Sequence, residues 1–354
     1  MNILVTGGAG FVGSNLAIKL KAKNPSFQVI AFDNLKRRGS EINLQKLKDF
    51  EIDFIHGDIR NPEDLEFKDS INLIIDASAE PSVMAGLKSS PLPVISNNLI
   101  GTINLLEVTR KHGSKLIFIS TSRVYGIDAL NKINLNENDT RFFLDSQQEL
   151  NGISNHGINE FFSTGEFRSF YGGTKLASEI LIQEYIKYCG LEAIINRCGV
   201  IAGPGQMGKI DQGIAVLWMA RHFWKGKLKY IGYGGHGKQV RDILHVDDLY
   251  RLIQKQIDNF SAFHSKTFNV GGGISCSISL QELTNLCSLV TGNKIHIDKD
   301  PNTRDADIRY YVTDNSKISS ISNWNPQYTV KDILSDILEW IRVNETQLKP
   351  ILTL

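Results

Sequence analysis

A tyrosine and a lysine four residues apart are the side chains of this 354-residue chain best suited to acid–base chemistry. Tyr171 and Lys175 stand in the run Tyr-Gly-Gly-Thr-Lys, and helical spacing puts both side chains on one face, one turn apart. A nearby ammonium group stabilises a phenolate, so Tyr171 can take a proton from an alcohol as a general base. This spacing arises by chance about once in a chain of such size, but of the ten tyrosines only Tyr171 has it.

A hydroxyl-rich segment supplies a third candidate group, Thr121, within the run Ser-Thr-Ser-Arg-Val-Tyr-Gly of residues 120–126. The segment follows the apolar run 116–120, which we expect to be a parallel strand. Open α/β sheets bind their ligands beyond the carboxyl ends of such strands, where a hydroxyl can polarise a substrate oxygen. For this segment taken alone, a polar strand end without a catalytic role is the alternative.

Three glycines near the N-terminus predict a phosphate-binding loop. Gly7, Gly10 and Gly13 are spaced three apart between a strand-like run and a helix-like run, and Phe11 and Val12 lie within the motif. Glycine permits the tight turn, the close approach of a pyrophosphate to the backbone, and the close packing of helix on strand. An ordinary glycine-rich turn is the alternative.

Carboxylates follow the next two predicted strands. Asp33 lies about twenty residues beyond the last glycine, where it can accept hydrogen bonds from both ribose hydroxyls, which favours NAD over NADP. The basic run 36–38 can instead attract a 2′-phosphate, or it forms a solvated loop. Asp58 and Ile59 can contact the adenine, and a simple strand-end turn is the alternative for them.

The elements that position these groups alternate short apolar runs with helical periodicity up to about residue 200. This alternation predicts an α/β fold, a Rossmann-type doubly wound parallel sheet, followed by a smaller C-terminal α/β domain. The expected strands are Ile3–Val5, Val29–Phe32, Phe54–His56, Leu73–Asp76, Leu116–Ser120 and Ala193–Asn196. The expected domains are residues 1–197, with 240–270 crossing back, and residues 198–354.

Helical periodicity is clearest in residues 94–111, where the predicted apolar stripe consists of Ile95, Leu99, Ile103, Leu106 and Thr109. Two further helices are expected near 280–290 and 330–343. Residues 126–170 are polar and lack a sustained period, so a long loop is predicted there. Long ordered loops are usually functional.

Composition excludes several classes of protein. Lys plus Arg is 39 and Asp plus Glu is 38, so no strong field exists to hold nucleic acid or an acidic membrane. The four cysteines form no CxxC pair, the first strand-like run begins at Asn2, and no apolar run is long enough to span a membrane. We expect a cytoplasmic protein without a metal site, in which Asp247 and Asp248 begin a helix and His245 lies in the core.

With these motifs in this order, the sequence resembles the extended short-chain dehydrogenase/reductase family of nucleotide-sugar enzymes, nearly from end to end. Residues 203–205 resemble the loop under the nicotinamide, residues 237–248 the diphosphate-arginine segment, and residues 268–271 the returning strand. The resemblance implies that NAD is contacted by Gly7, Gly10, Phe11, Val12, Gly13, Asp33, Asn34, Asp58, Ile59, Ala77, Ala79, Asn98, Tyr171, Lys175 and Val200.

The same resemblance implies a nucleotide-diphosphate sugar as substrate. Its implied contacts are Glu80, Arg123, Gln212, Arg241 and Arg304. Arg241 and Arg304 would hold the diphosphate, because a planar guanidinium meets phosphate oxygens with two hydrogen bonds. A surface ion pair is the alternative for these two arginines.

The residues after Thr121 indicate the subclass. Thr121 matches the family's catalytic Ser/Thr, and Ser122 and Arg123 stand where the family's 4,6-dehydratases carry the Asp and Glu that eliminate water. Without those carboxylates, the remaining groups of the site can still oxidise an alcohol and reduce the resulting ketone, which is what the reaction of an epimerase requires.

Within the family, the sequence is most similar to the CDP-paratose (CDP-tyvelose) 2-epimerases. The shared stretches are residues 32–38, 57–61, 136–141, the long insertion before Tyr171, Asp211-Gln212-Gly213, and residues 304–309. The sequence departs from the usual pattern at residues 76–80, which read Asp-Ala-Ser-Ala-Glu, at Phe170 and at Ala202.

The resemblance therefore implies oxidation of a CDP-hexose at C2 by tightly bound NAD and return of the hydride to the opposite face. Three alternatives remain: a 4-epimerase of a UDP-hexose or other nucleotide hexose, a ketosugar reductase that consumes NAD(P)H, and a non-catalytic NAD-sensing protein. Relatives commonly assemble, so a homodimer or homotetramer is expected, paired through the helix at 94–111 and the helix that begins near Tyr171.

Overall fold

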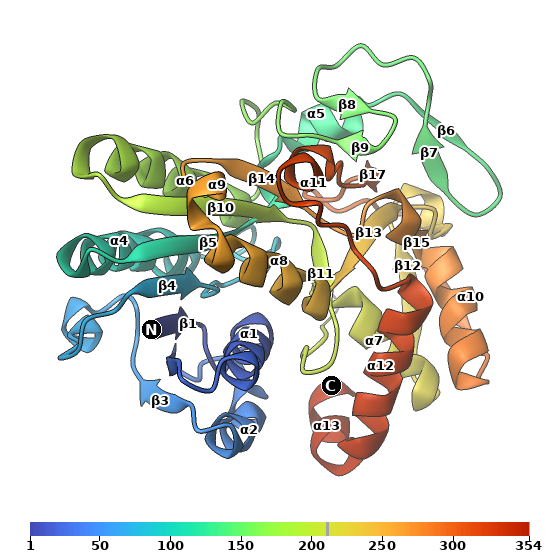
Figure 1. Ribbon diagram of the computed structural model, residues 1–354. Helices are drawn as coiled ribbons and strands as arrows, with labels where there is room; N and C mark the ends of the chain where they lie inside the picture. The colour runs from blue at the N-terminus through green and yellow to red at the C-terminus, as the bar shows by residue number, and fades with distance from the viewer. Residues whose placement is uncertain (210–211, 354) are drawn as a thin grey trace. The chain divides into compact units, whose positions relative to one another are not determined.

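The computed structural model describes residues 1–209 and 212–353, and the chain passes repeatedly between two units (Figure 1). The first unit consists of residues 1–124, 169–197 and 249–268, and the second of 125–168, 198–248 and 269–354. One division between the two units falls after residue 197. Residues 125–168, however, belong to the second unit, and the piece that returns to the first is 249–268 rather than 240–270.

The reason for the first difference is a hydrophobic contact. Leu135, Phe142 and Leu144 pack against Val240 and its buried neighbours, all within the second unit. The backbone N–H of Phe142 also donates to the carbonyl oxygen of Lys238, at 3.1 Å. This part of the insertion therefore gains its packing partners from the second unit.

A seven-stranded sheet forms the centre of the first unit, in the order β14-β10-β5-β4-β1-β2-β3. Its strands are β1 (Asn2–Thr6), β2 (Gln28–Asp33), β3 (Asp53–His56), β4 (Leu73–Asp76), β5 (Lys115–Thr121), β10 (Glu192–Cys198) and β14 (Thr267–Val270). The pairs β1/β2, β1/β4, β2/β3 and β4/β5 are parallel. The order reverses at β1, as in a doubly wound Rossmann-type sheet, which confirms the predicted fold class.

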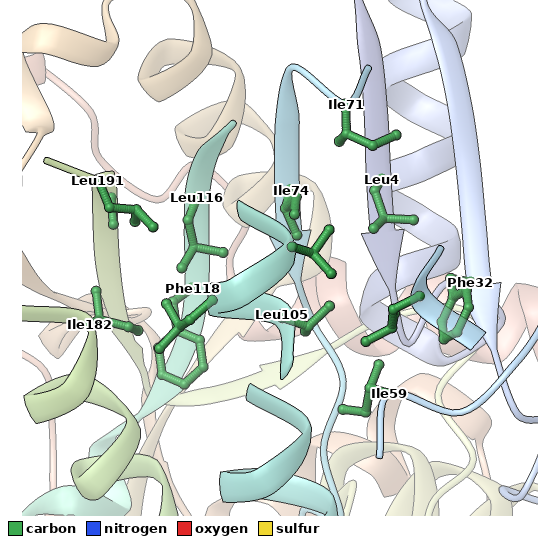
Figure 2. Packing of buried hydrophobic residues seen from close by; sticks show 14 of the residues in the cluster. Leu4, Phe32, Ile59, Ile71, Ile74, Leu105, Leu116, Phe118, Ile182 and Leu191 are labelled. Carbon is green, nitrogen blue, oxygen red and sulfur yellow. The ribbon is translucent and has the colours of Figure 1, made fainter. Parts of the chain in front are cut away.

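Helices cover this sheet. They are α1 (Phe11–Lys23), α2 (Asn43–Asp49), α3 (Leu92–Ile95), α4 (Gly101–His112), α6 (Phe170–Cys189), α8 (Val246–Asp258) and α9 (Phe260–Phe263). Figure 2 shows the core on one face, where side chains of the strands meet those of α4 and α6. Leu4, Ile74, Leu116 and Phe118 pack there with Leu105, Leu106 and Ile182.

The helical stretch 92–112 differs in one respect from its prediction. Residues Ser96–Ile100 form a π-turn between α3 and α4, and this wider turn rotates the residues that follow it. As a result Asn98, Thr102 and Leu105 are buried, whereas Ile95, Leu99 and Ile103 of the predicted stripe are only half-buried. The predicted burial of Leu106 and Thr109 is confirmed.

The second unit contains a smaller sheet in which β13 pairs with three strands. Its strands are β11 (Val200–Ala202), β13 (Val240–His245), β15 (Ser277–Ser279) and β17 (Tyr310–Tyr311), and β12 (Leu228–Ile231) pairs separately with β16 (Ile297–Asp300). The helices are α5 (Ile127–Asn131), α7 (Ile214–Phe223), α10 (Leu280–Thr291), α11 (Ser316–Ser322), α12 (Val330–Val343) and α13 (Glu345–Leu352). The helices expected near 280–290 and 330–343 are therefore present.

The long loop predicted over residues 126–170 contains short regular elements. It contains α5 and two short hairpins, β6 (Leu135–Glu137) with β7 (Phe142–Leu144) and β8 (Ile153–Ser154) with β9 (Gly157–Ile158). These strands have two or three residues each, which is too short to give a recognisable period in the sequence. Across the described residues, no helix is long and apolar enough to cross a membrane.

Candidate active site

The helix that carries Tyr171 and Lys175 begins directly after a capping residue. Ser169 caps α6, because its hydroxyl oxygen accepts a hydrogen bond from the N–H of Gly172 at 3.2 Å. Tyr171 is half-buried in the first turn, and Lys175 follows one turn later with 1% exposure. The structure thus places the predicted pair on one helix, at the spacing that lets the two side chains act together.

The Lys175 ammonium group is held by two contacts of different kinds. Its Nζ donates to the carbonyl oxygen of Ser78 at 3.3 Å and lies 4.4 Å from the ring centroid of Phe118. A ring face attracts a cation, and the carbonyl oxygen replaces one water molecule of its hydration shell. Both contacts fix a buried cation beside β5.

Thr121 ends β5 and is 7% exposed. Its Oγ1 accepts a hydrogen bond from the N–H of Arg123 at 3.2 Å, within the 3₁₀ turn of Ser122–Val124. The hydroxyl hydrogen of Thr121 can still be donated to a ligand. Because Phe118 lies under Lys175, the end of the strand that carries Thr121 is adjacent to the helix that carries the pair.

The glycine loop has the tight geometry that the sequence predicts. Gly7 has φ +63°, and a Cβ there would lie 2.8 Å from the carbonyl oxygen of Ala77. A Cβ on Gly13 would overlap the carbonyl oxygen of Gly7. Glycine is therefore required at both positions, one for the turn and one for the approach of α1.

The N-terminus of α1 fits a diphosphate. Among the described residues, no side chain caps the helix at its N-cap residue, Gly10. A Cβ on Gly10 would meet only the Gly7 residue, so open space lies on its other side. The first-turn N–H groups and the helix dipole then suit an anion, which agrees with NAD binding.

Asp33 lies directly beside this loop. Its two carboxylate oxygens accept hydrogen bonds from the N–H groups of Ala9, at 3.2 Å, and Leu35, at 2.8 Å. Burial raises the pKa of Asp33, and these backbone hydrogen bonds oppose the rise. The position at the end of β2 is the one predicted for a ribose contact.

Asp58 is engaged by a residue that the sequence reasoning missed. Arg60 donates from Nε to one carboxylate oxygen at 2.8 Å and from Nη2 to the other at 2.5 Å. Asn34 donates to the same carboxylate at 2.9 Å. These hydrogen bonds, led by that of Arg60, hold the pKa of Asp58 far below its usual range. The strand-end turn is thus present, and the adenine contact remains a prediction.

Asn98 holds the segment that follows β4. Its side-chain amide accepts from the N–H of Glu80 at 2.7 Å and donates to the carbonyl oxygen of Glu80 at 3.1 Å. It also donates to the hydroxyl of Thr174 on α6, at 3.3 Å. Asn98, predicted as a cofactor contact, therefore fixes Glu80 against the helix that carries Tyr171 and Lys175.

Asp76 and Ser78 also position this segment, although the sequence analysis gave them no role. The carboxylate of Asp76 is fully buried and accepts from the hydroxyls of Thr6, at 2.8 Å, and Ser78, at 2.5 Å. Ala77 and Ala79 flank Ser78 and are half-buried. Since the carbonyl oxygen of Ser78 also accepts from Lys175, the end of β1, the end of β4 and the lysine of the candidate pair share one network.

The second unit contains the remaining predicted residues. Arg241 donates to the carbonyl oxygens of Val240 and Ile308, at 2.7 Å each, and lies 3.5 Å from the Asp307 carboxylate. Arg304 is half-buried, and its carbonyl oxygen accepts from the N–H of Asp307. The Arg241 side chain and the Arg304 backbone thus both contact Asp307.

Four other predictions concern this unit. Val200 begins β11, and Gln212 is half-buried. Asp211, which precedes Gln212 in the sequence, lies outside the described residues. Helix α8 begins at Val246 as expected, and His245 is 2% exposed. The Asp248 carboxylate accepts from the N–H of Gln327 and of Tyr328, at 3.0 and 3.2 Å, which is a structural role.

Comparisons with known proteins identify relatives along the whole chain. The model of the NAD dependent epimerase/dehydratase family matches residues 3–271. The chain is 32% identical to CDP-paratose 2-epimerase of Salmonella typhi, over 96% of this chain and 99% of that protein. It is 28% identical to UDP-glucose 4-epimerase of Erwinia amylovora, over 96% of this chain and 97% of that protein.

A solved structure is also similar to this chain over almost its whole length. The crystal structure of dTDP-glucose 4,6-dehydratase from Bacillus anthracis, in complex with NAD, matches with a TM-score of 0.75 and 27% identity over 99% of each chain. The expected fold, the epimerase class of enzyme and the NAD cofactor are confirmed by these comparisons. The chain belongs to the NAD-dependent epimerase/dehydratase family.

Proposed function

We propose that this protein inverts C2 of the hexose in a CDP-hexose, by transient oxidation to a 2-ketosugar. The observation that carries the proposal is the arrangement of Tyr171 and the buried Lys175 on α6, adjacent to the end of β5 with Thr121. The similarity to CDP-paratose 2-epimerase over nearly the whole chain supports the choice of carbon and nucleotide.

Side chains of the protein itself accept and return the proton of the sugar hydroxyl. Tyr171 accepts it from the C2 hydroxyl of the sugar, and the Lys175 ammonium group stabilises the phenolate that makes this possible. The hydroxyl of Thr121 donates to the same sugar oxygen and orients it. Bound NAD would supply the redox chemistry, as acceptor of the hydrogen on C2 and its donor to the opposite face of the ketosugar. Tyr171 then returns the proton to the oxygen, so the cycle consumes neither base nor cofactor.

Dehydration lacks its acid and base in this site. The two residues after Thr121 are Ser122 and Arg123, in a short 3₁₀ turn. A serine hydroxyl and a guanidinium do not exchange protons near neutral pH as a carboxyl pair does. This argument separates the proposal from the dehydratases among the relatives, one of which matches at 27% identity.

Substrate binding is assigned to Arg241 and Arg304 for the diphosphate, with Glu80, Arg123 and Gln212 near the sugar. The Arg241 guanidinium now lies 3.5 Å from the Asp307 carboxylate. A diphosphate offers more acceptor oxygens and more negative charge than this one carboxylate, so it can displace that contact.

We also propose that two copies pair through the outer faces of the helical stretch 92–112 and of helix α6. The side chains of Leu92, Ile100 and Ile180 are 65%, 43% and 51% exposed on these elements. Apolar side chains on neighbouring helices are a frequent component of homodimer interfaces.

The test begins with mass spectrometry of the denatured protein for released NAD and continues with NMR of products from CDP- and UDP-sugars. Retained NAD with inversion at C2 of a CDP-hexose is the expected result. Inversion at C4 of a UDP-sugar would favour the second candidate, which the similarity to UDP-glucose 4-epimerase supports. Steady consumption of NADH would indicate a reductase, and absence of both NAD and turnover a binding protein.

A further inference from the structure

A buried charged cluster lies directly behind the candidate catalytic residues. The carboxylate of Glu179 on α6 accepts from the hydroxyl of Ser120 on β5 at 2.5 Å. Arg197 on β10 donates to the same carboxylate from Nε at 3.0 Å and from Nη2 at 2.7 Å. The exposures of Ser120, Glu179 and Arg197 are 3%, 1% and 8%. The cluster therefore ties three elements together in the interior.

Its position in the fold relates it to the candidate site. Glu179 follows Lys175 by four residues and Tyr171 by eight, so the three side chains share one face of α6. The rise of an α-helix places Glu179 about 6 Å from Lys175 and about 12 Å from Tyr171 along the axis. Ser120 immediately precedes Thr121 on β5. The cluster thus adjoins both elements that carry the proposed catalytic groups.

The charge balance of this cluster is costly to disturb. A buried carboxylate and a buried guanidinium compensate one another only while both are present and hydrogen-bonded. Removing one partner leaves a net charge in a medium that screens poorly. Such a charge, one and two helical turns from Lys175 and Tyr171, would change how readily the phenol ionises.

We propose that Ser120, Glu179 and Arg197 are positioning residues of the active site, which set the proton affinity of Tyr171. Arg197 neutralises Glu179, and Glu179 holds Ser120 and with it the end of β5 that carries Thr121. This inference rests on the proposed function, in which Tyr171 is the base. The cluster itself touches neither sugar nor cofactor.

Other charged groups face the same helix and act in every variant. Asp76 and Glu80 belong to the segment that binds Lys175 through Ser78, and Arg123 lies in the turn after Thr121. On α4, Glu107 pairs with Arg110 and accepts from Tyr185 at the far end of α6. None of these is altered in the test, so differences between variants report on the cluster.

The experiment is a spectroscopic titration of the Tyr171 phenol in the NAD-bound protein, taken as the difference from the Tyr171→Phe variant. In Glu179→Gln, the loss of one negative charge beside Arg197 is expected to lower the pKa of Tyr171 by about one unit at the helix spacing above. In Arg197→Gln, the uncompensated carboxylate is expected to raise it. The double variant Glu179→Gln/Arg197→Gln is expected to return it toward the wild-type value.

The conservative variant Arg197→Lys keeps the charge but cannot bridge both carboxylate oxygens. It is expected to leave the pKa of Tyr171 unchanged while lowering kcat and leaving KM within about twofold. Shifts of the same sign in both single Gln variants, or no shift in either, would overturn the proposal.

The test also gives a result if the charge variants do not fold, or if the protein epimerises no sugar. If the charge variants do not fold, Ser120→Ala decides: a kcat about tenfold lower with unchanged KM supports the positioning role, and an unchanged kcat overturns it. The phenol titration needs no turnover. Opposite pKa shifts in a protein that epimerises no sugar would therefore contradict the proposed function and leave the assignment of this cluster standing.

Discussion

Tyr171 and Lys175 are held to different degrees by the residues around them. Lys175 is 1% exposed and fixed by Ser78 and Phe118, whereas Tyr171 is half-buried in the first turn of α6. A fixed cation beside a more accessible phenol suits a base that must reach a substrate hydroxyl and then return the proton. The division of roles is therefore visible in burial as well as in residue type.

The first prediction concerns Tyr171→Phe. Loss of the phenol hydroxyl removes the general base, so turnover is expected to fall by about 10²- to 10⁴-fold, while NAD still copurifies. The matched control is Tyr185→Phe on the same helix, whose hydroxyl donates to Glu107 at 2.6 Å, an interaction that raises the pKa of Tyr185 to about 12. Turnover of the control is expected within twofold of wild type. If turnover of Tyr171→Phe falls only a few-fold, Tyr171 is not the general base.

A second prediction at this scale concerns Asp58 and pH. Arg60 lowers the pKa of Asp58, so the native state favours the ionised carboxylate. The resulting stabilisation is present above the ordinary carboxyl pKa of about 4 and is lost as pH falls from there toward the lower native value. Asp58→Asn is therefore expected to be less stable than wild type at pH 7. The difference in urea midpoint between wild type and Asp58→Asn should become smaller below about pH 4. A difference that does not change with pH would contradict the assignment.

At the scale of elements, the packing of α4 on the parallel sheet supports the end of β5. Leu106 on α4 is fully buried within the core that includes Leu116 and Phe118 of β5. Phe118 in turn lies under the Lys175 ammonium group. Loss of packing beneath this strand therefore weakens the support of the candidate site as well as the fold.

Leu106→Ala is expected to lower the free energy of unfolding by about 2–5 kcal/mol, because it removes buried methyl groups and leaves a cavity. The comparison is Leu289→Ala on α10, where the side chain is 71% exposed and the expected change stays within about 0.5 kcal/mol. Denaturant unfolding followed by circular dichroism measures both variants. Similar losses in the two would show that burial does not determine the effect.

The strands and the main helices could be predicted from the sequence because apolar runs and glycine breaks determine them locally. The burial pattern of residues 92–112 could not, because the π-turn at Ser96–Ile100 changes the helical register and places Asn98 inside. Asn98 is there as a hydrogen-bonding partner of Glu80, a contact between residues 18 positions apart. A periodicity argument counts apolar side chains and cannot anticipate a buried amide.

For the candidate site, spacing along one helix or one loop was enough to find Tyr171 and Lys175, and Gly7 and Gly13. The partners that hold them come from distant sequence positions: Ser78 meets Lys175 across 97 residues, and Ser120 meets Glu179 across 59. These contacts depend on the order of strands in the sheet. Sequence reasoning without that order therefore misses the positioning residues.

At the scale of the whole molecule, the chain passes between two units, and candidate residues lie in each. Tyr171, Lys175 and Thr121 belong to the first unit, while Arg241 and Arg304 belong to the second. The insertion 125–168 gains its packing from the second unit. The residues proposed for proton transfer therefore belong to the first unit, and the arginines proposed for the diphosphate belong to the second.

The proposed dimer can be tested by placing a charge in its interface. Ile180→Glu places a charge on the exposed face of α6, where the isoleucine side chain is 51% exposed, and is expected to convert a dimer into monomers because an interface core excludes unpaired charge. Light scattering after size-exclusion chromatography measures the mass. Leu289→Glu on α10 is the control and should leave the mass unchanged. A monomeric wild-type protein, or a dimer that survives Ile180→Glu, would contradict the proposed interface.

The central claim is that the hydrogen on C2 of the sugar leaves as a hydride and returns to the same carbon. The most direct measurement is NMR of the product formed by the NAD-bound protein in ordinary water from a CDP-hexose carrying deuterium at C2. We expect inversion at C2 with deuterium retained there and no net formation of NADH. Inversion with the deuterium exchanged for solvent hydrogen, or inversion only at another carbon, would contradict it.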